Sequence, residues 1–261
     1  MPNRIRSLAV GAVMGALLAA APAAARVDDD PLPRFEDRVC PGIMGLRTDA
    51  AETMVGMIRT NVEAFGLGTV NKEVCEPNLV VAFVDDGQAF LVALQARHET
   101  VFAEMARHDR EQLVSEAGPA LALLRVRSRS RDGMPISRRE NLMDAPQTYM
   151  AMAHSRIYTA TRKDIVASLV LIDRDAVRGL SLRQLADYAT FRALTRTLPP
   201  ADARGASIVG LFDSMGNRPA GLTDFDRTFL ATLYGGVPNL PGSARLAELT
   251  HATGYDFASE E

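Results

Sequence analysis

The feature that most constrains this chain is an apolar strand that leads, through a short turn, into a long helix. Residues 165–173 read IVASLVLID, and the turn 174–180 separates them from SLRQLADYATFRALTRTL at 181–198. Ser181 and Gln184 have the spacing of a capping box, and Pro199 ends the helix. This helix is apolar on more than one face, so we expect it to be central and buried.

The N-terminal half has the element order of a parallel crossover. An apolar stripe predicts a helix over 49–65, and the continuous apolar run 78–84 predicts a strand buried on both faces. A strand is expected within 36–46, a second helix from 88 to about 106, and a short helix at 109–117. Strand, helix and strand in this order predict parallel pairing, hence a mixed α/β (α+β) domain.

The remaining segments complete the expected fold. Alternation predicts a strand over 121–131, and residues 155–160 and 165–173 look like two adjacent strands of a hairpin. Thr223 and Asp226 form a second capping-box pattern, and 243–253 is a final short helix.

The N-terminus has the pattern of a secretory signal. Two arginines precede an apolar run at 8–21, and Ala23, Ala24 and Ala25 supply small residues for cleavage. An uncleaved anchor is the alternative, but the run is shorter than the roughly 20 residues that a span needs. We therefore expect a signal peptide at 1–25, a flexible lead-in at 26–33 and one domain at 34–261. The protein would be periplasmic or secreted, with no stable membrane insertion after cleavage.

The chain has two cysteines, Cys40 and Cys75. Outside the cytosol an even count favours a disulfide, and the chain-entropy model gives this loop roughly 4 kcal/mol of stabilisation. A redox or metal pair is the alternative. The spacing is too long for CxxC chemistry and no histidine is nearby, so we favour the structural bridge.

Four arginines alternate at Arg125, Arg127, Arg129 and Arg131, which places them on one face of the expected strand. Such a row could bind an anionic surface, a phosphate or a polysaccharide. It could also be a solvated edge strand whose charges prevent aggregation. The net charge of −3 and the pI of about 5.9 favour the edge strand and give no reason to expect a nucleic-acid partner.

A set of residues with a characteristic spacing follows the long helix: Ser207, Phe212, Leu222, Thr223, Asp226, Leu233 and Tyr234. Together with the order of strands and helices, this set resembles a zincin-type metallopeptidase domain, and in particular exported zincin-like proteins of proteobacteria. In that family the segment after the helix closes the metal site from below. The resemblance covers roughly 164–241 and implies a mixed sheet with a long central helix and a small helical C-terminal lobe.

The resemblance does not extend to the catalytic residues. Active relatives bind zinc through two histidines one turn apart, with a glutamate between them as base. Here Ala186 and Thr190 would occupy the histidine positions, and Asp187 that of the glutamate. Alanine cannot bind a metal, and a lone threonine hydroxyl is a poor zinc ligand. We therefore regard these positions as vestigial and assign no catalytic, metal or cofactor residue.

Two structural expectations follow for the vestigial site. Ala186 and Thr190 should point together towards the segment 207–213, and replacing Asp187 by alanine should have only a modest effect on stability. The four histidines, at positions 98, 108, 154 and 251, contain no pair spaced four residues apart that could replace the missing ligands.

These patterns predict an exported, non-catalytic binding or scaffold module of the cell envelope, with an unknown peptide or envelope component as its partner. The alternative is a hydrolase with a displaced metal site or a non-metal active site. Paired acids in 85–86 and 224–226 could serve glycoside hydrolysis. Both pairs also fit helix starts, where aspartate is favoured, and we prefer that interpretation.

Overall fold

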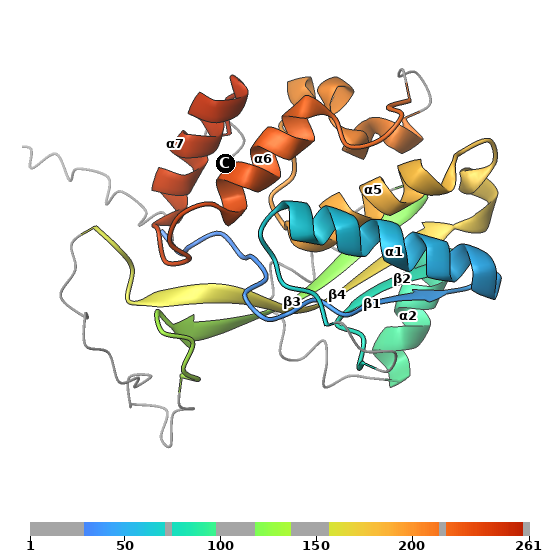
Figure 1. Ribbon diagram of the computed structural model, residues 1–261, viewed down its shortest axis with the longest axis horizontal. Coiled ribbons are helices and arrows are strands. Elements are labelled where there is room, and N and C mark those ends of the chain that lie inside the picture. The colour runs from blue at the N-terminus through green and yellow to red at the C-terminus, as the bar shows by residue number, and fades with distance from the viewer. Residues whose placement is uncertain (1–28, 71–74, 98–117, 137–156, 214–217, 258–261) are drawn as a thin grey trace, which may run out of the picture.

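The structure is a computed structural model that describes residues 29–70, 75–97, 118–136, 157–213 and 218–257. A four-stranded sheet runs through it in the order β1-β2-β4-β3 (Figure 1). The strands are β1 (Pro41–Met44), β2 (Leu79–Val84), β3 (Ala120–Ser130) and β4 (Thr161–Asp173). β1, β2 and β4 are parallel, and β3 is antiparallel to β4. The mixed sheet confirms the predicted α/β (α+β) class.

Helices cover the two faces of the sheet unequally. α1 (Thr48–Ala64) and α5 (Leu182–Leu194) lie over one face, and α2 (Gly87–Arg97) lies on the other (Figure 1). The residues of β3 alternate accordingly. Ala120 and Ala122 join the larger core beneath α1 and α5, whereas Leu121 and Leu123 join the smaller core beneath α2.

The C-terminal part is helical. Short 3-10 turns η1 (Arg174–Val177), η2 (Ala201–Ala206) and η3 (Ile208–Phe212) flank α5, and α6 (Asp224–Tyr234) and α7 (Gly242–Thr253) follow. Phe191 of α5 packs on Phe229 of α6, with ring centroids 5.4 Å apart. Phe257 also packs on Phe229, with ring centroids 5.5 Å apart, so this lobe shares the larger core.

A bulge opposite Arg125 and Val126 changes which side chains of β4 face the helices. Val170 and Ile172 belong to the larger core, and so does Ile165, an odd number of residues away. An uninterrupted strand would place Ile165 on the opposite face. The irregularity therefore keeps an apolar side chain beneath the helices where the sheet narrows to two strands.

The two long strands extend beyond the rest of the sheet. β2 pairs with β4 only from Ser168 to Asp173. We call residues 125–130 and 161–167, which project together, the ribbon (Figure 1). Residues 29–36, here called the strap, lie against the free side of β4: Arg34 N donates to Lys163 O at 3.2 Å, and Ile165 N donates to Arg34 O at 2.9 Å.

The described part of the expected lead-in packs against the domain. Pro31 is buried and Leu32 packs against the larger core. A composition rich in aspartate and proline suggested a flexible segment. Its residues Asp29 and Asp30 instead contact α7 and β4, which lie more than 130 positions further along the sequence. Residues 26–28 lie outside the described residues.

Most predicted elements are confirmed, and one pairing is wrong. The crossover from β1 through α1 to β2 and both capping boxes are present. The predicted hairpin of 155–160 with 165–173 does not form: β4 is one strand that pairs along its whole length with β3. α5 ends at Leu194, earlier than the predicted end at residue 198, and the next residue, Thr195, is extended with φ −139° and ψ 141°. The expected helical residues 98–106 and 109–117 lie outside the described part.

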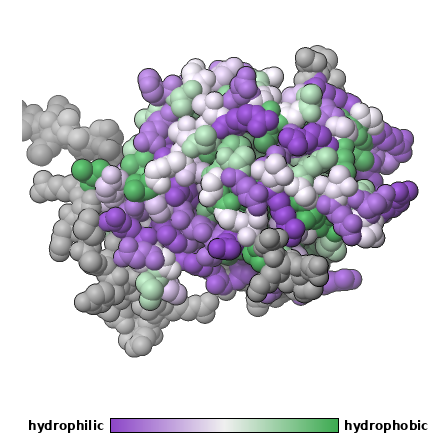
Figure 2. Space-filling view, in the orientation of Figure 1, coloured by the Kyte–Doolittle hydropathy of each residue, from purple (hydrophilic) through white to green (hydrophobic). Residues whose placement is uncertain are grey.

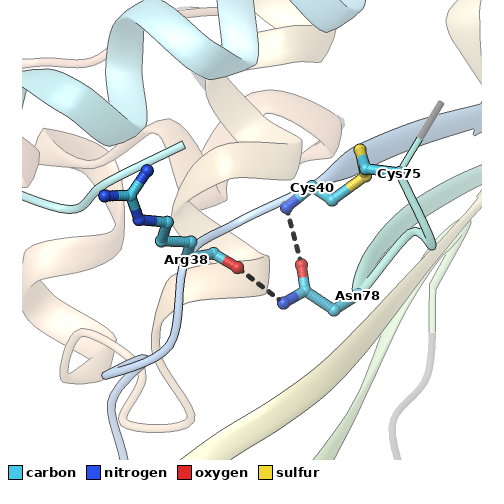
Figure 3. Close-up of a disulfide and its surroundings, with 4 residues drawn as sticks. All are labelled: Arg38, Cys40, Cys75 and Asn78. Carbon is cyan, nitrogen blue, oxygen red and sulfur yellow. Dashed lines mark hydrogen bonds between the residues drawn. A yellow bond between two sulfur atoms is a disulfide. The ribbon is translucent and has the colours of Figure 1, made fainter. Parts of the chain in front are cut away.

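The predicted disulfide between Cys40 and Cys75 is present, with a Cα–Cα distance of 6.2 Å. Asn78 holds the same corner: its Oδ1 accepts from Cys40 N at 2.8 Å, and its Nδ2 donates to Arg38 O at 2.9 Å (Figure 3). The bridge therefore ties the start of β1 to the segment that enters β2. In the part of the chain that the structure describes, no helix is long and apolar enough to cross a membrane.

Candidate functional site at the centre of helix α5

The central turns of α5 are buried on all faces of the helix. All residues from Leu185 to Leu194 are buried, and Ala186 and Thr190 have no exposed surface at all. Since a metal or substrate needs an open coordination position or cleft, the turn that resembles a zinc-binding helix offers solvent no access.

Asp187 is a fully buried carboxylate that joins three elements. Its Oδ1 accepts from Asn61 Nδ2 of α1 at 2.7 Å. Its Oδ2 accepts from the backbone N of Leu222 at 2.9 Å and from Arg183 Nε at 3.1 Å. Arg183 lies one turn earlier on α5 and keeps 45% of its side chain exposed, so the ion pair reaches from the core to solvent.

The loop before α6 is seated directly on this carboxylate. A Cβ on Gly221 would lie 2.4 Å from Asp187 Oδ2, closer than real contacts allow, so only glycine fits there. The absence of that side chain lets Leu222 N approach the carboxylate. Groups of the protein itself therefore occupy the space around the residue that would be the catalytic base.

Thr190 points towards α1. Its hydroxyl donates to Ala186 O at 2.7 Å and accepts from Asn61 Nδ2 at 3.2 Å. The expectation that Thr190 faces 207–213 is wrong, because its hydroxyl is bonded to Asn61 of α1. Tyr188 of α5 does contact this segment, since its ring lies 4.9 Å from that of Phe212.

Asp226 is the second buried carboxylate, and it locks the start of α6. Its Oδ1 accepts from Ser207 Oγ at 2.5 Å, and its Oδ2 accepts from Ile208 N at 2.8 Å. Thr223 donates to Oδ2 from both its N and its Oγ1, at 2.9 and 2.8 Å. Burial raises the pKa of Asp226 despite these bonds. Ser207, Thr223 and Asp226, three of the residues on which the resemblance rests, are thus joined by hydrogen bonds that hold the start of α6 in place.

The other candidate acids also have structural partners. Asp86 caps α2 by accepting from Ala89 N at 2.9 Å, and Asp85 pairs with Arg174 at 2.8 Å. Asp224 is exposed in the first turn of α6. These contacts agree with the interpretation of both acidic pairs as helix starts.

The arginine row lies on the α2 face of the ribbon, in register with Leu121 and Leu123, on the outermost strand of the described sheet. Arg129 pairs with Asp37 at 3.3 Å and with Asp164 at 3.5 Å. Asp164 also contacts Arg162 at 2.9 Å. Burial raises the pKa of Asp164 more than these arginines lower it. Both carboxylates that Arg129 contacts belong to its own chain.

Asn61 and Arg183 belong to this site and were not singled out from the sequence. Arg183 precedes Asp187 by four residues, a spacing that predicts a helical ion pair. Asn61 interrupts the apolar stripe of α1 and is buried, so a polar residue on the core side was the available signal.

Metal-binding groups of three or more His, Cys, Asp or Glu do not occur among the described residues. His251 is exposed on α7, and the histidines at 98, 108 and 154 lie outside the described ranges. Comparisons with protein-family models, curated proteins and solved structures find no match to this chain. The interpretation of the site thus depends on its own geometry.

Proposed function

We propose that this protein is an exported, non-catalytic binding or scaffold module of the cell envelope, built on a degenerate metallopeptidase-like (zincin-like) fold. The observation that carries the proposal is the state of Asp187. A carboxylate that acts as a base needs access to water or substrate. This one is buried and engaged by Asn61, Leu222 and Arg183.

The neighbouring positions support the same proposal. Ala186 offers no ligand atom, and the Thr190 hydroxyl is already bonded to a backbone oxygen and to Asn61. The disulfide between Cys40 and Cys75 is compatible with an oxidising compartment, which supports export. The proposed ligand is an extended peptide or an envelope component, because an outermost strand such as β3 is the kind of surface to which extended peptides add.

Metal content and hydrolysis test the non-catalytic part of this proposal. We expect the purified protein, dialysed against zinc and then against buffer, to retain far less than one zinc per chain. We also expect labelled peptide mixtures to stay intact. Stoichiometric zinc would contradict the absence of a metal site, and hydrolysis that Asp187→Asn abolishes while the fold remains intact would establish a hydrolase.

The binding part needs a readout that locates the ligand. A library of extended peptides can be screened by fluorescence polarisation, and the best binder titrated into labelled protein for amide chemical-shift mapping. We expect the largest shifts in β3, with α7 unaffected. Failure of every peptide to bind, or shifts confined to α6 and α7, would reject a peptide site on this edge.

A further inference from the structure

We propose that residues 29–33, the first part of the strap, form a releasable clip on α7, whereas residues 34–36 anchor the strap permanently. The clip would make the docking of α7 a local switch that opens while the rest of the core stays folded. This inference is independent of the function proposed above, since it concerns only how the two ends of the chain are joined.

The anchor is built from buried contacts. Arg34 Nη1 donates to Leu233 O at 3.1 Å and to Gly235 O at 3.3 Å, so its guanidinium satisfies carbonyl groups at the C-terminal end of α6. Phe35 N donates to the hydroxyl of Tyr234 at 3.1 Å, and its ring belongs to the larger core. Release of residues 34–36 would therefore disrupt the core itself.

The polar contacts of the clip with α7 and the ribbon are exposed, and its apolar contacts with the core are limited to the buried Pro31 and to Leu32. α7 begins after Pro241, whose side chain provides no cap. Asp29 supplies one from 214 positions away: its Oδ1 accepts from Ser243 N at 3.0 Å and from Ser243 Oγ at 2.8 Å. Asp30 pairs with Lys163 of the ribbon at 2.7 Å.

The polar contacts contribute little stability, so local opening costs mainly the burial of Pro31 and the packing of Leu32. Asp29 and Asp30 are both exposed, and exposed ion pairs contribute little in water. α7 packs chiefly on α6, so the clip provides a separate link from α7 to the ribbon. Figure 2 shows mostly hydrophilic residues over the ribbon on this face, with a few hydrophobic ones near its outer end. Loss of the clip would uncap α7 without removing its contacts with α6.

A substitution at Gly242 can test sterically whether the clip is seated on α7. A Cβ at this position would lie 2.4 Å from the backbone oxygen of Asp30. Alanine favours a helix over glycine, so Gly242→Ala would stabilise α7 if the strap were not seated there. With the strap seated, the methyl group must push the clip away. The same substitution therefore has opposite consequences for α7 in the two cases.

Hydrogen exchange of the full chain, followed by mass spectrometry, tests the clip. Asp29→Ala and Gly242→Ala should each accelerate exchange in the first two turns of α7 by about five- to tenfold, the factor expected for one lost N-cap. Exchange in α1 and α5 should be unchanged. Gly56→Ala is the matched control, because a Cβ at Gly56 meets nothing within 4 Å; it should not accelerate exchange in α7.

Three outcomes would overturn the inference. Unchanged exchange of α7 in Asp29→Ala would show that the carboxylate does not cap the helix. Slower exchange of α7 in Gly242→Ala would show that the strap is not seated on it. Equal acceleration of α1, α5 and α7 would show that residues 29–33 belong to the global folding unit and do not release separately.

Discussion

Replacement of Asp187 by alanine should destabilise the fold strongly, in contrast to the modest effect expected from the sequence. The substitution removes one of the two acceptors of Asn61 Nδ2, which keeps Thr190 Oγ1, and the acceptor of Leu222 N, both in the buried interior. A buried donor left without a partner costs about 1–3 kcal/mol. Two such N–H groups imply a loss of about 4 kcal/mol, similar to that for breaking other buried charge pairs. Arg183 adds little, because much of its side chain is exposed.

Urea unfolding monitored by circular dichroism, with the disulfide intact, measures this loss. Asp187→Asn keeps the shape and one acceptor oxygen, but its amide nitrogen must face a donor, so we expect an intermediate loss of about 1–3 kcal/mol. Asp175→Ala is the control: this aspartate pairs with Arg178 on the surface, and its removal should leave the midpoint unchanged. A loss below about 1 kcal/mol for Asp187→Ala at an unchanged m-value would refute the assigned role of the carboxylate.

Three further predictions concern stability. Asp226→Asn should lower the free energy of unfolding by about 2–4 kcal/mol in the same assay, since an amide cannot accept all four hydrogen bonds; an unchanged midpoint would contradict this. Burial raises the pKa of Asp164 above its ordinary value of 3.8, so the unfolded chain releases this proton first as pH rises. The stability of the wild type relative to Asp164→Asn should therefore fall as pH increases from 3.8 and level off above the folded-state pKa. A rise in this relative stability would show that folding lowers the pKa of Asp164. Replacing both Cys40 and Cys75 by serine should cost about 2–5 kcal/mol by thermal unfolding, and an unchanged melting temperature would show that the bridge is dispensable.

Local signals in the sequence were sufficient to predict the helices that cap themselves and the parallel crossover from β1 to β2. Ser181 with Gln184, and Thr223 with Asp226, are three residues apart, and both capping boxes form as predicted. The pairing of β3 with β4 could not be predicted in this way. Both segments have strand-like patterns, but no local feature shows that Ser130 lies opposite Thr161 and not beside a nearer segment.

The candidate site could be located from the sequence but not described. The position of Asp187 within a buried helix was predictable from apolar periodicity. Its partner Asn61 is 126 positions away, and the face of α5 that meets α1 is decided by packing of the whole core. A carboxylate in a core helix must have partners, yet periodicity does not indicate which residues they are.

The strap also imposes an order on folding. Arg34 and Asp29 bind groups that are 199 to 214 positions further along the chain. Nearly the whole polypeptide must therefore be synthesised before the strap finds its partners on α6 and α7, and closing so long a loop is slow. Until α6 is in place, the guanidinium of Arg34 lacks its carbonyl acceptors. In a chain that stops before residue 224, the guanidinium of Arg34 would have no α6 carbonyl groups to bind, and the apolar ring of Phe35 beside it would stay exposed. Such a chain would be a target for proteases and chaperones.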